Sequence, residues 1–192
     1  CLLLATGAAG NEPLSDNSSA LYKALRDAVE QVCVALAQAI VRDGEGATKF
    51  IAIRVDGGRD VGECRRVAFG IAHSPLVKTA FFASDPNLGR IVCAIGNTAA
   101  PDADPARVSF WLDDVLVVDH GGRAASYREE DGQRVMKKDE IAVRVDLGRG
   151  TGHADEVVAV QGPHVLCAVG HDDVWAFGAL QLVDVDRPHV GR

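Results

Sequence analysis

The sequence has no apolar run of the roughly 20 residues that a membrane-spanning helix needs. The longest candidate, residues 32–41, is interrupted by Gln38. An excess of positive charge is also missing, because 20 Lys and Arg stand against 27 Asp and Glu and give a net charge of −7. A nucleic-acid-binding protein would normally carry a basic stripe. We therefore expect neither a membrane nor a nucleic acid as a partner.

Several short signatures of known sites are absent as well. The sequence contains no G-x-G-x-x-G, G-x-x-x-x-G-K-[ST] or G-x-S-x-G string, so dinucleotide-binding, P-loop and α/β-hydrolase interpretations have no support. The His residues near the end of the chain lack metal-ligand spacing, and we expect no metal site. The five Cys include no C-x-x-C pair, which argues against a zinc knuckle or a secreted disulfide framework and favours buried thiols in a reducing cytoplasm.

What is present is the composition of an ordinary globular domain. The 192 residues are 47% hydrophobic and 24% charged, which leaves room for one or at most two domains with a real core. The opening, Cys1–Thr6, has neither an initiator Met nor the basic region of a signal peptide. We interpret the chain as a downstream piece of a longer protein.

The spacing of apolar residues predicts helices interleaved with strands. We expect helices over about residues 17–42, 60–72 and 126–137, the first capped by Ser18 or Ser19 and ended by Asp43 and Gly44. Strands are expected at 50–55 and 141–146, with a hairpin at 108–112 and 115–118. The apolar segment 76–82 is expected to be buried, and 90–95 is a second apolar segment. This order predicts an α/β or α+β fold.

The tail from Thr151 differs from the preceding sequence in the pattern of its apolar residues. Its short apolar runs are broken by Gly, Pro and His, and they suggest extra strands for which no partner can be assigned: 157–160, 165–169, 174–177 and 180–185.

One string stands out as a possible site. In Asp43–Phe50, Glu45 lies between two glycines that let the backbone bend tightly and bring its carboxylate close to a ligand, with Thr48 and Lys49 as possible hydrogen-bond donors. The alternative is the end of a helix leading into a strand, with Glu45 simply solvated.

Two further strings carry unusual residues. Lys78 lies within an apolar run, where an unpaired ammonium is costly, so it either meets a carboxylate such as Glu45 or reaches the surface. A loop containing Asn87 follows it. The segment His120–Arg123 fits either an anion site or a polar hairpin end.

These strings, in this order, resemble the β chain of the ornithine acetyltransferase (glutamate N-acetyltransferase) family over about residues 1–150. The matching strings are Leu2–Gly7, Val41–Phe50, Ser74–Ala80, Asp85–Gly89, Asp119–Tyr127 and Lys138–Ile141.

The resemblance implies an αββα-type layered fold, similar to that of the self-cleaving DmpA-like aminopeptidases, and a role in arginine biosynthesis. Family members cut themselves before a threonine, which becomes the N-terminal nucleophile of the β chain. It takes the acetyl group from N2-acetyl-L-ornithine as an acyl-enzyme and passes it to L-glutamate. This threonine lies upstream of Leu2, so the resemblance places no catalytic residue in the chain, which alone should be inactive.

The resemblance also implies a binding site and partners. Glu45 matches the Glu of the family's D-G-E-G motif, which lines the substrate site, and Lys78 and Asn87 are further candidates. The expected partner is the α chain of the same precursor, in a cytoplasmic α2β2 heterotetramer. No metal or cofactor is expected, and acetyl-CoA is a co-substrate only in bifunctional members.

Residues 151–192 do not match the usual ending of the family, so its two C-terminal site residues cannot be placed. We therefore divide the chain into a family-like domain over 1–150 and a divergent tail over 151–192, which is either genuine or the product of a reading-frame change near Gly150. Two other functions stay open. One is an aminopeptidase or amidase with an N-terminal nucleophile, and the other is a non-catalytic module for subunit pairing.

Overall fold

The computed structural model describes residues 7–8, 10, 14–87, 89–98, 102–161 and 164–170, with side chains up to residue 155. The chain divides into two compact units, residues 1–37 with 172–192, and residues 38–171. The boundary crosses the first helix, α1 (Ala20–Arg42), and the second unit holds the sheet and the remaining helices.

Helix α1 begins as its sequence predicts. The Ser19 hydroxyl accepts a hydrogen bond from the backbone N–H of Tyr22 at 3.1 Å, which satisfies an amide that has no helical partner. Ser18 instead donates to the Asp16 carboxylate at 2.7 Å. Most of the large apolar side chains of the helix are exposed: Leu21, Tyr22, Leu25, Val32, Leu36 and Ile40. The apolar periodicity thus predicted the helix correctly, while the structure leaves these side chains uncovered.

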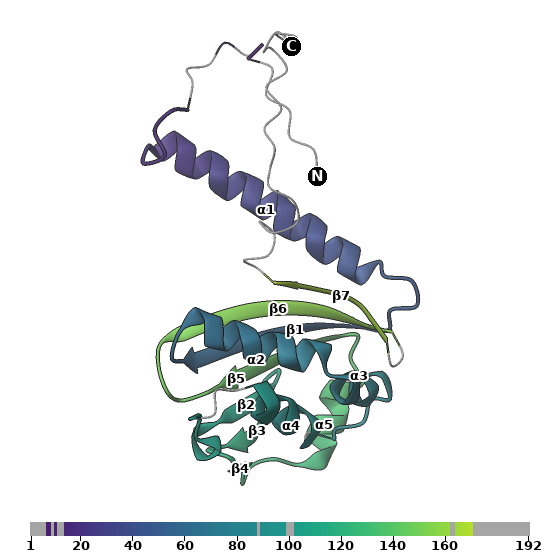
Figure 1. The fold of residues 1–192 in the computed structure, drawn as a ribbon. Helices are drawn as coiled ribbons and strands as arrows, with labels where there is room; N and C mark the ends of the chain where they lie inside the picture. Colours follow the sequence, from purple (N-terminus) through teal and green to yellow (C-terminus); the bar gives the residue numbers. More distant parts are fainter. Residues whose placement is uncertain are drawn as a thin grey trace, which may run out of the picture. The chain divides into compact units, whose positions relative to one another are not determined.

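The second unit is built on one mixed sheet of seven strands in the order β4-β3-β2-β5-β1-β6-β7 (Figure 1). The strands are β1 (Lys49–Gly58), β2 (Ser109–Leu112), β3 (Val115–Asp119), β4 (Gly122–Arg123), β5 (Glu140–Asp146), β6 (Gly152–Gln161) and β7 (His164–Gly170). β1 is parallel to β5 and antiparallel to β6, so it is a central strand. The β2–β3 pair is the predicted hairpin.

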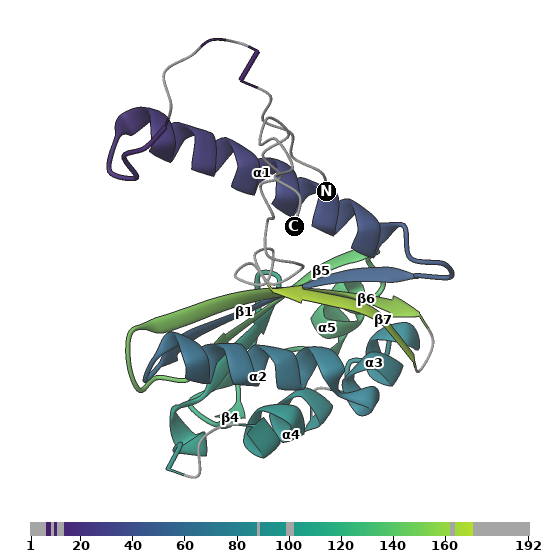
Figure 2. The same ribbon diagram turned by 45° about the horizontal axis from the view of Figure 1, so that its top comes forward.

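Helices cover one face of this sheet. Figure 2 shows α2 (Val61–His73), α3 (Pro75–Phe82) and α4 (Gly89–Thr98) together on that face. A short 3-10 turn (Pro105–Arg107) precedes β2, and α5 (Glu129–Met136) precedes β5. Each of α2 and α3 starts at a side-chain cap. The Asp60 carboxylate accepts from the Glu63 N–H at 2.8 Å, and the Ser74 hydroxyl accepts from the Val77 N–H at 3.4 Å.

Alternation along the central strands creates the core. Every second residue of β1 and β5, such as Ile53 and Val143, is buried against the helices, while Arg54 and Arg144 between them point to the opposite face and are exposed. From α2 the apolar face contributes buried residues including Val67 and Ile71. Each fully buried aliphatic side chain contributes roughly 1.5–3 kcal/mol, which makes this interface the main source of stability.

Two expectations need correction, and two apolar segments gain an element type. The segments 76–82 and 90–95, left without an assigned type, are helices α3 and α4. Leu76 and Phe82 are exposed rather than buried, because only one side of α3 faces the core. Of the described thiols only Cys64 is buried, and Cys93 is exposed.

The first part of the tail does have a partner. Strand β6 runs antiparallel to β1 with Lys49 opposite Val160, and β7 pairs with β6. The apolar runs 174–177 and 180–185 lie outside the described residues. Strand β6 thus extends the sheet beyond residue 150, while the division of the chain at that residue stays a prediction.

Candidate functional site

The predicted site string forms a tight turn between α1 and β1. The Ala47 N–H donates to the Gly44 carbonyl at 2.9 Å, so Glu45 and Gly46 are the two central residues of a β-turn. Gly46 has φ of 69°, whereas Glu45 is not among the residues with positive φ. This combination is the signature of a type II turn, whose third position favours glycine. The turn therefore presents Glu45 at its tip.

The entrance to this turn is held by Arg42, the last residue of α1. Its guanidinium donates to the Glu140 carboxylate at 3.0 Å and lies 3.8 Å from the centre of the Phe50 ring. A planar guanidinium suits such stacking better than an ammonium does. Arg42 thus ties the helix end to the first residues of both β5 and β1.

The exit from the turn is held by Lys49. Its side chain is buried, with 7% exposure, and its ammonium donates to the backbone carbonyls of Met136 at 2.8 Å and Lys138 at 3.0 Å. The Phe50 N–H donates to the Asp139 carbonyl at 2.8 Å. Burial lowers the pKa of Lys49, and the nearby charge of Asp139 opposes that shift in part. Sequence reasoning saw Lys49 as a donor to a ligand, whereas the structure turns it inward.

Glu45 itself is exposed, and within the described part of the chain no hydrogen bond or ion pair engages its carboxylate. It also lies outside the linings of the two described cavities. The structure therefore places an uncompensated carboxylate on an anchored turn. Its predicted role in substrate binding stays a prediction.

Lys78 is buried on α3, with 5% exposure. Among the described residues it pairs with no carboxylate, Glu45 included, and burial alone lowers its pKa. Lys78 therefore does not meet a described carboxylate, and its side chain is too buried to count as a surface residue. The side chain is largely buried, no described residue pairs with its ammonium, and its Nζ is not among the fully enclosed atoms that lack a partner.

Asn87 lines a cavity of about 540 Å³ that joins two of the sequence strings. Its lining includes residues 85–87, part of α4, and Val117, Arg123 and Tyr127. The Arg123 guanidinium lies 5.0 Å from the centre of the Tyr127 ring. Burial raises the pKa of the Tyr127 phenol, whose hydroxyl has no hydrogen-bond partner in the described part. The spatial pairing of these two strings could not be read from their spacing.

The His120–Arg123 string is a hairpin end. His120 and Gly121 have φ of 46° and 76°, and the chain turns there from β3 into β4. The His120 ring lies 2.6 Å from the Asp119 carboxylate, and its backbone N–H donates to the Ser109 hydroxyl at 3.0 Å. These contacts support the simpler of the two interpretations.

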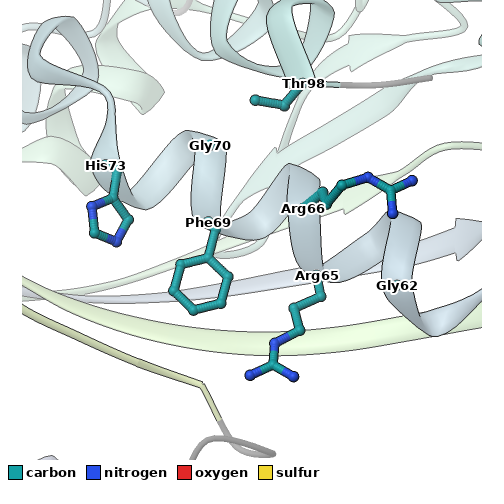
Figure 3. A pocket seen from close by; sticks show the side chains of 7 residues that line it. All are labelled: Gly62, Arg65, Arg66, Phe69, Gly70, His73 and Thr98. Carbon is teal, nitrogen blue, oxygen red and sulfur yellow. The ribbon is translucent and has the colours of Figure 1, made fainter. Parts of the chain in front are cut away.

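A separate open groove, of about 610 Å³, runs along α2, and the sequence analysis did not predict it. Figure 3 shows Arg65, Phe69 and His73 following one another along the helix, while Thr98 of α4 lies next to Gly70 of α2. The Phe69 and His73 ring centres are 5.6 Å apart. The spacing of four residues between these side chains was a usable signal, because it places them on one helix face.

A buried ion pair was also missed. Glu63 is fully buried and accepts from the Arg59 N–H at 2.7 Å, while its other oxygen lies 3.4 Å from the Arg149 guanidinium. Arg149 also donates to Asp102 at 2.7 Å, and this hydrogen bond lowers the pKa of the Asp102 carboxyl. The pair joins the start of α2 to the loop after β5. We assign it a structural role, since breaking a buried pair is strongly destabilising.

The described residues form neither a metal centre nor a membrane-spanning helix. No group of three or more His, Cys, Asp or Glu side chains is placed to hold a metal ion. None of the helices in that part of the chain combines the length and apolar character needed to cross a bilayer.

Comparison with known proteins assigns the family. A profile of the ArgJ family matches residues 1–159. A solved structure, the arginine biosynthesis bifunctional protein ArgJ from Bacillus halodurans, superimposes with a TM-score of 0.71 at 31% sequence identity, covering 79% of this chain and 70% of that chain. The chain therefore belongs to the ArgJ family.

This membership confirms the resemblance to the ornithine acetyltransferases and the expected mixed α/β layered fold. It also assigns the chain to the acetyltransferases of arginine biosynthesis. The match extends nine residues past Gly150, to residue 159 within β6.

Proposed function

We propose that this chain is the β-chain part of a glutamate N-acetyltransferase, which moves the acetyl group from N2-acetyl-L-ornithine to L-glutamate. The observation that carries the proposal is the family match over residues 1–159. By the resemblance, a threonine hydroxyl upstream of Leu2 attacks the acetyl carbonyl and the ornithine amine leaves. The glutamate amine then attacks the acyl-enzyme, and the hydroxyl regains its proton.

Glu45 is the residue of this chain that we assign to substrate binding. The side-chain ammonium of N-acetylornithine needs an anionic partner, and a carboxylate provides a charge-assisted hydrogen bond. The exposed carboxylate of Glu45 and its anchored turn support this assignment. Lys78 and Asn87 are further candidates. An unpartnered ammonium such as that of Lys78 suits a substrate carboxylate, and Asn87 lines a cavity together with Arg123.

The proposal includes partners and setting. The α chain of the same precursor would complete the site and assemble with this chain as an α2β2 heterotetramer in the cytoplasm. The reaction needs no metal or cofactor, because the nucleophile is a side chain of the protein. Acetyl-CoA would be an additional acetyl donor if the protein is bifunctional.

Replacing Glu45 in the full-length protein tests the proposal. Glu45→Gln removes the charge and keeps the shape of the side chain, so we expect kcat/KM for N-acetylornithine to fall about 10- to 150-fold, the loss of a hydrogen bond to a charged group of about 1.5–3 kcal/mol. The measurement is ornithine release with glutamate as acceptor. The matched control is Glu130→Gln, which changes an exposed carboxylate of α5 in the same way. This variant should behave as the unmodified protein.

Unchanged kinetics for Glu45→Gln would remove Glu45 from the substrate site. Hydrolysis of peptide amides by the unmodified protein, without acetyl transfer to glutamate, would replace the transferase proposal by the amidase alternative.

A further inference from the structure

We propose that Lys49 is a positioning residue, whose buried ammonium holds the turn that carries Glu45 in the orientation that the substrate requires. The inference rests on the proposed role of Glu45 in substrate binding. Lys49 touches no substrate in this proposal, because its side chain points into the protein.

The contacts of Lys49 tie β1 to a distant part of the chain. Its ammonium donates to the carbonyls of Met136 and Lys138, where α5 ends. Helix C-termini leave carbonyl groups without helical partners, and the negative end of the helix favours a cation there. The ammonium therefore satisfies two acceptors, one buried and one partly buried, that would otherwise be left open.

Both ends of the Glu45 turn contact the same short segment, residues 136–140, one through an exposed ion pair and the other through a buried ammonium. Arg42, before the turn, binds Glu140 of that segment. Lys49, after the turn, binds Met136 and Lys138. The six residues between Arg42 and Lys49 thus span two anchors on one platform, and a span this short leaves its tip little freedom.

Lys49 is close enough to Glu45 in the sequence for its contacts to restrict the orientation of Glu45. Glu45 precedes Lys49 by four residues, so their Cα atoms are separated by at most about 14 Å. Gly46 lies between them, and a glycine offers little resistance of its own when an anchor is lost. Without the Lys49 contacts the turn would sample more conformations, and fewer of them would present the carboxylate to the substrate.

The test uses a ratio that cancels general effects on the enzyme. In the full-length protein, kcat/KM is measured for N-acetylornithine and for N-acetylnorvaline, which has the same carbon chain without the side-chain ammonium. The ratio of the two values reports the contact between Glu45 and that ammonium. A merely structural role of Lys49 would lower both values together and leave the ratio unchanged.

We expect Lys49→Met to lower this ratio about tenfold, mainly by raising KM for N-acetylornithine. Lys49→Arg keeps a cation at this position, so its ratio should stay within about threefold of that of the unmodified protein. Lys137→Met, an exposed lysine next to the same platform, is the matched control and should leave the ratio unchanged. In the double variant with Glu45→Gln, the loss should be no greater than that of Glu45→Gln alone, because both changes remove one contact. If Lys49→Met does not fold, Lys49→Gln takes its place in the same comparison.

The outcomes separate the two proposals. If Glu45→Gln lowers the ratio while Lys49→Met leaves it unchanged, or if the two losses multiply in the double variant, Lys49 does not position Glu45. If Glu45→Gln itself leaves the ratio unchanged, the proposed function of Glu45 fails, and the positioning role fails with it.

Discussion

Two lysines are buried in this protein, and their surroundings differ. Lys49, at the start of β1, has 7% exposure and donates to two backbone carbonyls. Lys78, in α3, has 5% exposure and has no hydrogen-bond partner in the described part of the chain. Burial lowers the pKa of both. Burial by itself therefore does not reveal whether a charged group stabilises a fold. The hydrogen-bond acceptors around the group decide whether its contribution to the free energy of unfolding is favourable or unfavourable.

The two environments follow from the elements that carry the lysines. Lys49 begins a central strand beside the end of α5, where open carbonyls are available. Lys78 lies within a helix, where the backbone carbonyls are already used by the helix itself. The first lysine therefore completes a set of hydrogen bonds, while the described residues provide no acceptor for the second.

Removing the first ammonium should have the largest effect on stability. Lys49→Met leaves one buried and one partly buried carbonyl without a donor, and we expect the free energy of unfolding to fall by about 2–4 kcal/mol. Urea unfolding of the full-length protein measures the change, with Lys137→Met as a control that should stay within about 0.5 kcal/mol. If Lys49→Met lowers the free energy of unfolding by less than about 1 kcal/mol, the hydrogen bonds of Lys49 do not make it more stabilising than Lys78.

Removing the second ammonium should act in the opposite direction. Lys78→Met replaces a largely buried ammonium, for which the described residues provide no partner, by an apolar side chain of similar length, so we expect the free energy of unfolding at neutral pH to rise by about 1–2 kcal/mol. The same urea experiment measures it. A loss of stability in this variant would show that Lys78 has a stabilising partner in the folded protein.

The pH dependence sharpens the same point. Because the pKa of Lys78 in the folded protein lies below its ordinary value of 10.5, the unfolded chain binds more protons between those two pKa values. Stability should therefore rise with pH across that window and reach its full gain above 10.5. Lys78→Met lacks this contribution, so its advantage over the unmodified protein should shrink between pH 7 and pH 11. A constant difference would contradict the assignment.

The smallest effect is expected at the other anchor of the turn. Arg42 binds Glu140 at a site where both side chains are well exposed, and such ion pairs contribute little. We expect Arg42→Gln to lower the free energy of unfolding by about 0.5 kcal/mol, most of it at low salt. An effect as large as that of Lys49→Met would mean that the stacking of Arg42 on Phe50, rather than the ion pair, supports the turn.

Local patterns were enough for several elements and for the shape of the candidate site. Apolar periodicity predicted α1 and α2, a run rich in β-branched residues predicted β1, and alternation predicted β5, because these signals depend only on neighbouring residues. The glycines around Glu45 predicted a tight turn, and the structure has one. The short apolar segments that became α3 and α4 could not be assigned, because a run of that length fits a buried strand as well as a helix.

Contacts between distant segments were beyond the same reasoning. The carbonyl groups that bind Lys49 lie 87 and 89 residues further along the chain. Strand β6 joins β1 from about 100 positions away, which is why the tail runs had no assignable partner. The cavity that unites Asn87 with Arg123 and Tyr127 has the same origin.

The amino-acid order alone determined the family of this protein, the class of its fold and the turn that carries Glu45, since motif strings, periodicity and glycine positions are local properties. Tertiary structure alone decided which buried lysine is satisfied, which strand completes the sheet next to β1, and which segment braces the turn. The physical reason is that a hydrogen bond between remote residues depends on where the whole chain places its backbone carbonyls, and no local pattern carries that information.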